Sequence, residues 1–206
     1  MRTICCVGTG PSLTKEQIAQ ARWKGFELYG CNLVYQIVPD LDLLYGCNYG
    51  FWETYWHQGL RDHSAQKWTT NKHAAEMFGI NWIAEKFMHG LSTDPDVISH
   101  GHGSGFSLVS MAHRAGADRI VLLGYDMRYA ADYDPKNRNP GSTPRHYFGE
   151  YEPHLQHWPS KQVKSGVHVE LLDLYRSVAN QGLVEIINAT PDSAIECFER
   201  RDINAI

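Results

Sequence analysis

A short apolar strand followed by a glycine turn, at the start of the chain, constrains the fold more than any other feature. Residues 3–7 (Thr-Ile-Cys-Cys-Val) carry β-branched or small apolar side chains, which is typical of a strand buried on both faces. Gly8 and Gly10 then let the backbone turn tightly and approach another group closely. Pro11 suits the entry to a helix, which the pattern predicts over residues 15–21.

This strand, turn and helix predict a site for an anion. Ser12 or Thr14 can cap the helix, and the N–H groups at a helix N-terminus attract a phosphate. The glycine spacing is neither G-x-G-x-x-G nor a P-loop with its lysine, so those specific nucleotide motifs are excluded. A tight connection that binds nothing is the alternative.

Length and charge narrow the class of protein. A chain of 206 residues is typical of one α/β domain, so we expect residues 1–206 to form a single Rossmann-like domain, with a mostly parallel sheet flanked by helices. The formal net charge of −4 argues against a nucleic-acid partner. Aromatic residues make up 12% of the chain, and many lie in polar stretches, which is typical of ligand sites and interfaces.

The cysteines indicate free thiols rather than a disulfide framework. Their number is odd and no C-x-x-C spacing is present, which also argues against a zinc site. They are Cys5, Cys6, Cys31, Cys47 and Cys197. No apolar run approaches the ~20 residues that span a bilayer, and no signal peptide is recognisable. We therefore expect a cytoplasmic protein.

Two further predicted strands end in asparagines. They cover residues 26–32 and 41–48, and Asn32 and Asn48 stand at their ends. The carboxyl ends of parallel strands meet at the edge of a sheet where ligands bind. An asparagine side chain both donates and accepts hydrogen bonds, which suits a base edge or sugar hydroxyls. A turn or a helix cap is the alternative use of each asparagine.

A second glycine turn follows at residues 100–105 (His-Gly-His-Gly-Ser-Gly). It leads into a helix over residues 106–116 and then into a strand over 119–126, which ends in Gly-Tyr-Asp. The turn again exposes free N–H groups to an anion. His100 and His102 alternate as metal ligands on a strand do, but no carboxylate lies close in sequence, so we expect no metal.

The rest of the chain adds regular elements and one long irregular stretch. The pattern predicts a short helix at 33–38, a helix at 49–66, a strand at 68–70, a helix at 72–78, an ambiguous segment at 80–87, a short strand at 97–98, a helix at 167–181 and a strand at 183–188. Residues 188–193 place further polar groups at the ligand edge. Residues 127–165 lack apolar periodicity, and a loop this long is typically an active-site lid. Within it, residues 145–157 hold the candidates for proton transfer.

Six short motifs, in order, resemble the bacterial sialyltransferases of the Campylobacter type. They also resemble a related domain of unknown function that includes archaeal 6-hydroxymethylpterin diphosphokinases and flagellin-modifying proteins. The motifs are residues 7–13 (Val-Gly-Thr-Gly-Pro-Ser-Leu), Cys31 with Asn32, Asn48, residues 103–105 (Gly-Ser-Gly), residues 116–126 and residues 146–149 (His-Tyr-Phe-Gly).

The resemblance implies a nucleotide-sugar donor, CMP-sialic acid in the sialyltransferases, held at the carboxyl edge of the sheet without a metal or a tightly bound cofactor. By this resemblance and the strand-end argument, we expect the nucleotide to be bound by Gly8, Thr9, Gly10, Pro11, Ser12, Asn32, Asn48, Gly103, Ser104, Gly105, Tyr125, Asp126 and Tyr129. The expected catalytic residues are Glu150, His146 and Tyr147, with a sugar or another hydroxyl compound as acceptor.

The sequence departs from the sialyltransferase pattern at three places. Thr9 stands where the first glycine turn of the family has an asparagine, and Arg128 stands where the family has a tyrosine. Glu150 stands where the histidine that closes the His-Tyr-x-Gly-His run, the family's base, is expected. Glu150 or His146 is therefore the candidate base, because a carboxylate also serves when its pKa is raised.

Three functions are compatible with these features. The first is a glycosyltransferase that acts by direct displacement at the anomeric carbon. The second is a diphosphokinase of the 6-hydroxymethylpterin type, which needs ATP and Mg²⁺ and would use Asp126, Asp132 and Asp134. The third is a non-catalytic binding protein on the same fold, similar to the short phage-encoded members of the group. The aromatic segment 49–58 is a candidate interface of a homo-oligomer.

Overall fold

The computed structural model describes residues 1–206 except 102, 130–131, 133–145, 150, 156–162 and 165–166. Its centre is an eight-stranded sheet in which every pair of neighbouring strands is parallel. In spatial order the strands are β12 (Glu199–Arg200), β11 (Glu185–Asn188), β8 (Arg119–Leu123), β1 (Thr3–Val7), β2 (Glu27–Cys31), β3 (Leu43–Tyr45), β4 (Gln66–Thr69) and β5 (Asn81–Trp82). The predicted α/β fold with a parallel sheet is confirmed.

The strand order reverses next to the first strand. From β1 the chain adds β2 to β5 on one side, and then returns to add β8, β11 and β12 on the other. In an open parallel sheet, the crevice at such a reversal is where ligands bind, beyond the carboxyl ends of the strands. The ends of β1 and β8 are therefore the first place to look for a site.

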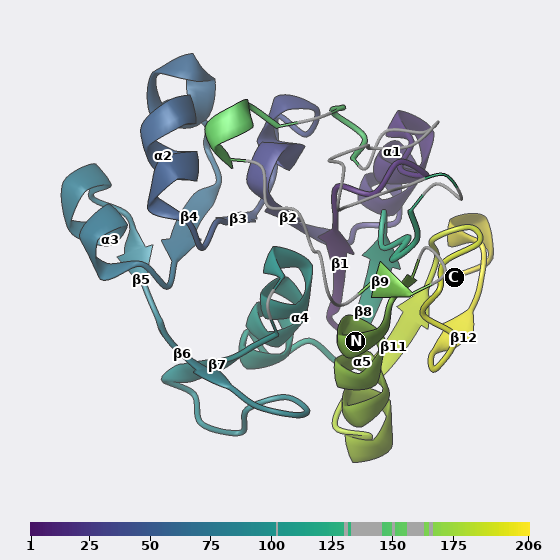
Figure 1. Ribbon diagram of the computed structural model, residues 1–206. Helices are drawn as coiled ribbons and strands as arrows, with labels where there is room; N and C mark the ends of the chain where they lie inside the picture. Colours follow the sequence, from purple (N-terminus) through teal and green to yellow (C-terminus); the bar gives the residue numbers. More distant parts are fainter. Residues whose placement is uncertain (102, 130–131, 133–145, 150, 156–162, 165–166) are drawn as a thin grey trace.

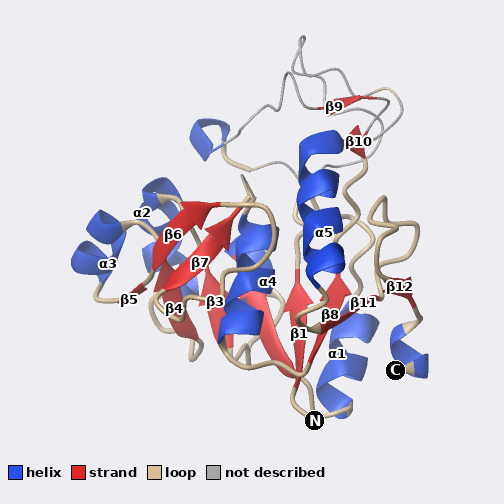
Figure 2. Cartoon of the chain, turned by 90° about the horizontal axis from the view of Figure 1, so that it is seen from below, coloured by secondary structure: helices blue, strands red, loops and turns tan. Residues whose placement is uncertain are grey.

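Helices cover both faces of this sheet, as Figures 1 and 2 show. The helices are α1 (Lys15–Trp23), η1 (Asn32–Gln36), α2 (Tyr49–Tyr55), α3 (Lys72–Phe78), α4 (Ser104–Arg114) and α5 (Val169–Gln181). Successive side chains of β1 point to opposite faces: Ile4 and Cys6 pack with α4 and α5, whereas Cys5 and Val7 pack with α1, η1 and α2. This two-sided burial explains why the strand reads as an uninterrupted apolar run.

Smaller elements complete the described chain. They are the parallel pair β6 (Ala84–Phe87) and β7 (Val97–His100), the antiparallel pair β9 (Val163–Lys164) and β10 (Val167–His168), and the short helical turns η2 (Trp56–Leu60), η3 (Pro153–Leu155) and η4 (Ile203–Ala205). The predicted lid therefore contains η3 and β9. Within the described residues, no helix combines the length and the apolar character that a membrane crossing needs.

Local chemistry explains where α1 begins. The Thr14 side chain accepts a hydrogen bond from the Gln17 backbone N–H at 3.1 Å, and the Gln17 side chain accepts one from the Thr14 N–H at 2.9 Å. This reciprocal capping box satisfies two backbone donors at the helix start. Of the two predicted caps, Thr14 is confirmed, and Ser12 makes different contacts.

The structure corrects several predicted boundaries. The helix expected at 49–66 ends at Tyr55 and continues only as η2, because Gly59 has a left-handed φ of 89°. The ambiguous segment 80–87 forms β5 and β6. Helix α5 begins at Val169 rather than at residue 167. The elements β12 and η4 were not predicted, because two or three residues are too few to show a periodic pattern.

The aromatic segment 49–58 is part of the core. Phe51, Trp52 and Tyr55 are buried. Trp56 packs on Phe78 of α3 at a ring-centroid distance of 4.9 Å. These side chains hold α2 against the sheet and α3, and a homo-oligomer interface at this segment stays a prediction.

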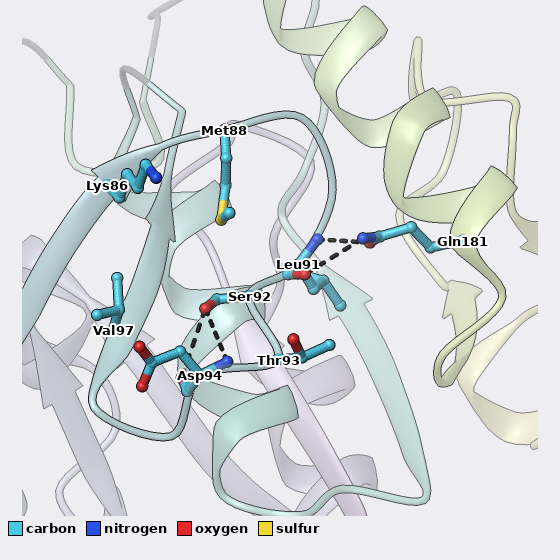
Figure 3. Close-up of a pocket in the computed structure, with 8 residues that line it drawn as sticks. All are labelled: Lys86, Met88, Leu91, Ser92, Thr93, Asp94, Val97 and Gln181. Carbon is cyan, nitrogen blue, oxygen red and sulfur yellow. Dashed lines mark hydrogen bonds between the residues drawn. The ribbon is translucent and has the colours of Figure 1, made fainter.

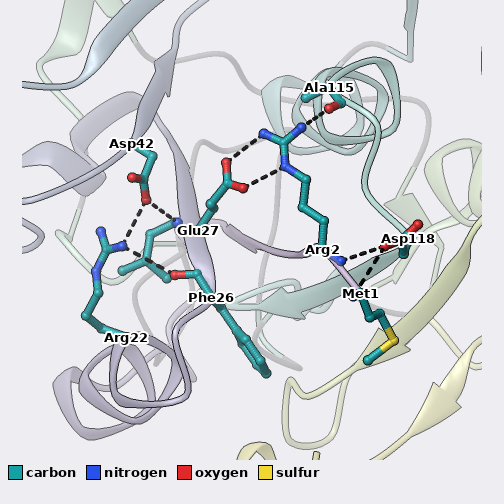
Figure 4. A network of polar contacts seen from close by, with 9 residues as sticks. Met1, Arg2, Arg22, Phe26, Glu27, Asp42, Ala115 and Asp118 are labelled. Atoms are coloured by element: carbon teal, nitrogen blue, oxygen red, sulfur yellow. Dashed lines mark hydrogen bonds and ion pairs between the residues drawn. The ribbon is translucent and has the colours of Figure 1, made fainter.

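A network of charges closes the amino-terminal edge of the sheet, opposite the ligand edge (Figure 4). The Arg2 guanidinium donates to both carboxylate oxygens of Glu27, at 2.6 and 2.8 Å. The Asp42 carboxylate accepts from the Leu28 backbone N–H at 2.7 Å and from Arg22 at 3.0 Å. These contacts join the starts of β1, β2 and β3, so we assign them to stability rather than to function.

This network predicts a pH-dependent loss of stability. The hydrogen bond from Arg2 lowers the pKa of Glu27 below its ordinary value of 4.5, so the contribution of the pair is complete above that pH and is lost as the pH falls through the folded-state value. We expect Glu27→Gln to lower the free energy of unfolding at pH 7 by less than about 1 kcal/mol, because the pair is partly exposed.

Urea unfolding at pH 7 and at pH 3 measures this effect. The difference between wild type and Glu27→Gln should be smaller at pH 3 than at pH 7. Glu76→Gln, at an exposed position of α3, is the control and should show no such dependence. An equal difference at both pH values would contradict the assignment.

Candidate functional site

The glycine turn after β1 is hydrogen-bonded to the end of β8. The N–H of Gly8 donates to the Leu123 carbonyl and that of Gly10 to the Gly124 carbonyl, both at 2.8 Å. Ser12 donates to the Asp126 carboxylate twice, from its N–H at 3.1 Å and from its hydroxyl at 2.9 Å. The N–H groups that the sequence assigns to a phosphate therefore already have partners within the chain.

These two glycines are required by packing. A Cβ on Gly8 would lie 2.6 Å from the Gly124 carbonyl oxygen, and one on Gly10 would lie 1.9 Å from the Asp126 carboxylate. The carboxylate thus occupies the place that we expected an anion to occupy. Burial raises the pKa of Asp126, although its bonds to Ser12 oppose the shift. The close approach that explains the glycines is made by the residues that follow β8.

The end of β8 is itself held by the segment after β11. The Thr190 hydroxyl accepts from the Tyr125 N–H at 3.0 Å, and the Ser193 hydroxyl donates to the Tyr125 carbonyl at 2.6 Å. Asn188 donates to the Ile195 carbonyl at 3.0 Å. Asn188, Thr190 and Ser193 are fully buried, so they support the turn and do not extend the ligand edge as the sequence suggested.

Tyr125 is likewise a supporting residue. Its ring is buried, and its hydroxyl donates to the Gly105 carbonyl at 3.0 Å, which fixes the start of α4 against the end of β8. The prediction that Tyr125 contacts a nucleotide is not compatible with this burial. Pro11 is exposed beside this turn, and Tyr129 is half-buried after it.

The asparagines at the ends of β2 and β3 differ from ordinary caps. Asn32 has a left-handed φ of 52°, which non-glycine residues seldom adopt and which is often found at functional sites. Asn48 is exposed at the N-terminus of α2, and its side chain makes no capping hydrogen bond. At the next strand end, by contrast, Asn71 caps α3 through the Ala74 N–H at 2.9 Å. Asn48 therefore stands at the N-cap position of α2, but its side chain does not cap the helix.

The second glycine turn delivers the N-terminus of α4 to the same edge. Gly103 is the N-cap and provides no capping side chain. Ser104 lies next to β3, because its hydroxyl is 3.4 Å from the Cys47 thiol. The N-terminal end of an eleven-residue helix attracts an anion through its N–H groups and its dipole. Ser104, Gly105 and Asn48 are thus brought together, as predicted from their places at strand and turn ends.

Part of the predicted lid reaches across these strand ends. The Thr9 hydroxyl lies 3.1 Å from Nδ1 of His146, and the Thr9 carbonyl accepts from the Tyr147 N–H at 2.7 Å. Further along, Nε2 of His154 lies 2.9 Å from the Thr54 hydroxyl, so η3 sits against α2 (Figure 1). Segment 146–155, as far as it is described, therefore runs from the end of β1 to α2.

Tyr151 joins this cluster, and the sequence analysis did not assign it to the site. Its ring packs edge-on against His146 at a centroid distance of 4.8 Å. Burial raises the pKa of its hydroxyl, an effect opposed by hydrogen bonds with the side chains of Thr9 and Asn32. The one signal for Tyr151 in the sequence was its position close to a candidate base. Its neighbours Thr9 and Asn32 lie far from it in the chain, and such contacts leave no local pattern in a sequence.

Other predicted residues lie elsewhere or outside the described part. Glu150, His102 and Asp134 lie outside the described residues. His100 of β7 faces Glu85 of β6, with Nδ1 3.1 Å from the carboxylate. The pairing of β6 with β7 therefore brings a carboxylate next to this histidine, although none lies close to it in the sequence. Among the described residues, no group of three or more histidine, cysteine or acidic side chains is arranged to hold a metal.

The buried cysteines contribute packing. Cys5, Cys6 and Cys31 are buried free thiols, and burial raises the pKa of Cys31 to about 12. They therefore stay protonated at neutral pH and behave as small apolar side chains. The prediction of free thiols is confirmed.

A cavity of about 330 Å³ lies away from the sheet edge, between the β6–β7 connection and α5 (Figure 3). The Gln181 side chain crosses to it from α5, accepting from the Leu91 N–H at 2.5 Å and donating to the Leu91 carbonyl at 3.2 Å. This contact pins the loop to the helix. None of the predicted site residues that the structure describes lines the cavity.

Together these features define the class: a Rossmann-like α/β protein whose candidate ligand edge is formed by strand-end asparagines and a helix N-terminus. No family model matches the chain, and no curated protein matches it. Solved structures match the chain in fold. The sialyltransferase CstII from Campylobacter jejuni in complex with the substrate analogue CMP-3FNeuAc matches with a TM-score of 0.52 at 13% identity.

A second CstII structure, in complex with cytidine-5′-monophosphate, matches with a TM-score of 0.51 at 12% identity. Both matches cover 100% of this chain and 88% of the other. The chain therefore has the fold of a Campylobacter-type sialyltransferase, and the resemblance seen in the sequence is confirmed at the level of the fold.

Proposed function

We propose that the protein is a glycosyltransferase that uses a nucleotide sugar and transfers by direct displacement at the anomeric carbon. The observation that carries this proposal is the exposed Asn48, which occupies a cap position without capping and lies at the same sheet edge as Asn32 and the N-terminus of α4. The fold shared with a sialyltransferase that binds a CMP-sugar analogue supports a nucleotide sugar as the substrate class.

In this proposal the asparagines bind the nucleotide, and the start of α4 binds its phosphate. Asn32 and Asn48 offer amide donors and acceptors to the base and the sugars. Ser104 and Gly105 offer a helix N-terminus, which stabilises the negative charge that develops on the departing phosphate. Tyr147 and Tyr129 are proposed as further hydroxyl contacts to that phosphate.

The acceptor hydroxyl must lose a proton as its oxygen attacks the anomeric carbon. His146 and Glu150 are the proposed bases. No metal ion is proposed, because the helix N-terminus and the tyrosines supply the stabilisation of the leaving group. A single domain with an insert at residues 127–165, located in the cytoplasm, remains our prediction for the organisation of the protein.

The diphosphokinase alternative would place Mg²⁺ on Asp126. Both oxygens of that carboxylate accept hydrogen bonds from Ser12. A cation would have to replace those contacts, which tie the β1 turn to β8. This observation favours the glycosyltransferase over the kinase.

Release of CMP from a CMP-linked sugar tests the proposed function. The purified protein is incubated with CMP-N-acetylneuraminic acid and EDTA, and free CMP is measured by chromatography, with water or added lactose as acceptor. We expect CMP release that does not need a metal. Consumption of ATP and 6-hydroxymethylpterin only with Mg²⁺ would establish the kinase instead, and no turnover in either assay would support the binding protein.

A further inference from the structure

Four side chains connect the ends of β1 and β2 with the segment above them: Thr9, Asn32, His146 and Tyr151. Thr9 holds that segment twice, through its hydroxyl to Nδ1 of His146 at 3.1 Å and through its carbonyl to the Tyr147 N–H at 2.7 Å. Tyr151 packs against the imidazole on one side and has Thr9 and Asn32 as hydrogen-bonding neighbours of its hydroxyl. The imidazole is therefore held by Thr9 at the end of β1 and by packing against Tyr151.

A contact at Nδ1 decides which ring nitrogen can take up a proton. A neutral histidine carries one N–H and one lone pair. When Thr9 Oγ1 accepts from Nδ1–H, the lone pair is on Nε2, and a histidine held in this tautomer is the form that serves as a general base. The Tyr151 hydroxyl has the side chains of Thr9 and Asn32 as neighbours, and in this arrangement it helps to keep the Thr9 hydroxyl directed at the imidazole.

We propose that His146 is the general base of the transfer reaction and that Thr9 is its positioning residue, supported by Tyr151. This inference rests on the proposed function, and it selects His146 over Glu150. In the reaction, Nε2 of His146 takes the proton of the acceptor hydroxyl while that oxygen bonds to the anomeric carbon. The bond from this carbon to the phosphate oxygen breaks, the phosphate keeps the electron pair, and the imidazolium later returns its proton to water.

The tautomer is measured without any activity. In protein labelled with ¹⁵N-histidine at pH 8, the two-bond ¹H–¹⁵N spectrum distinguishes Nδ1–H from Nε2–H, and His146→Gln assigns the signals. We expect His146 in the Nδ1–H form in wild type and in Thr9→Ser, which keeps the hydroxyl. Thr9→Val removes it at nearly constant volume and should convert most of the population to Nε2–H. A wild-type protein in the Nε2–H form, or an unchanged Thr9→Val, would overturn the inference.

Kinetics separate a positioning role from a purely structural one. For CMP release, we expect Thr9→Val to lower kcat about 10- to 100-fold with KM unchanged, and Thr9→Ser to restore it. Tyr151→Phe keeps the ring and should lower kcat in the same direction. If Thr9→Val does not fold, Tyr151→Phe decides, and normal kcat in that variant would contradict the proposal.

A comparison of variants at His146 and Glu150 tests which of the two residues is the base. His146→Gln should lower kcat about 100-fold or more, and by a clearly larger factor than Glu150→Gln. The opposite order would overturn the inference and leave the glycosyltransferase standing. If no variant, nor the wild type, turns over any nucleotide sugar, the proposed function has failed, and with it the assignment of a base.

Discussion

Asn48→Ala is expected to weaken nucleotide binding about 100-fold or more while leaving the melting temperature of the free protein nearly unchanged. The side chain is exposed and makes no capping hydrogen bond, so its removal costs the fold little. An amide that makes two hydrogen bonds to a ligand contributes roughly 2–3 kcal/mol, which corresponds to about a 100-fold change in Kd. Calorimetric titration with CMP measures the loss.

Asn71→Ala is the matched control for this variant. Asn71 stands at the end of β4 and caps α3, with its side-chain oxygen 2.9 Å from the Ala74 N–H. We expect this variant to lose about 1 kcal/mol of stability and to bind CMP normally. If Asn48→Ala bound normally, or if it lost stability as Asn71→Ala does, the assignment of Asn48 to the site would be wrong.

Gly10→Ala is expected to have the largest effect on stability. The new Cβ would lie 2.5 Å from the Gly124 carbonyl oxygen and 1.9 Å from the Asp126 carboxylate. The carboxylate can move, but the backbone carbonyl accepts the Gly10 N–H that joins β1 to β8, so the clash separates the two central strands. We expect a loss of roughly 3–5 kcal/mol, measured by urea unfolding.

Gly103→Ala provides the comparison for a glycine without this constraint. Its φ is −154°, which any residue adopts, and a Cβ there would lie 3.7 Å from Leu171. We expect this substitution to cost less than about 1 kcal/mol, chiefly because alanine is a poorer N-cap than glycine. Equal stability of the two variants would show that the β1–β8 junction is not as tight as described.

The sequence predicts the strands near the centre of the sheet well. It predicts poorly which side chains hold the residues of the candidate site in place. Residues 3–7 and 119–123 are buried on both faces, so an apolar run with a glycine stop is visible without knowledge of the fold. The strand-end asparagines follow from the same reasoning, because parallel strands share one ligand edge. Asn32 and Asn48 are therefore at the edge that the sequence indicated.

The partners of that edge could not be predicted, because they come from distant parts of the chain. Asp126 fills the glycine turn from 114 residues away, and His146 meets Thr9 over 137 residues. A turn that binds a phosphate and a turn that binds a neighbouring carboxylate need the same glycines and the same N–H groups. Only the fold shows that the Asp126 carboxylate and the end of β8 bond to this turn.

Buried polar residues misled the sequence reading for a related reason. Thr190 and Ser193 follow a strand end, as ligand-binding residues do, but both are fully buried and bond to the backbone of Tyr125. The same residue types serve a ligand or a turn, and burial decides between them. Tyr151 shows the opposite error: no sequence pattern assigned it to the site, and only its tertiary contacts with His146, Thr9 and Asn32 place it there.

Thermal melting against a small panel of nucleotides shows whether the edge that carries Asn48 binds a nucleotide. The panel is CMP, CDP, UDP, GDP and ATP, each with Mg²⁺ and with EDTA, on the wild type and Asn48→Ala. A ligand that binds only the folded state raises the melting temperature by mass action. We predict a rise with CMP that is independent of the metal and absent in Asn48→Ala. A rise only with ATP and Mg²⁺, or no rise with any nucleotide, would contradict the account.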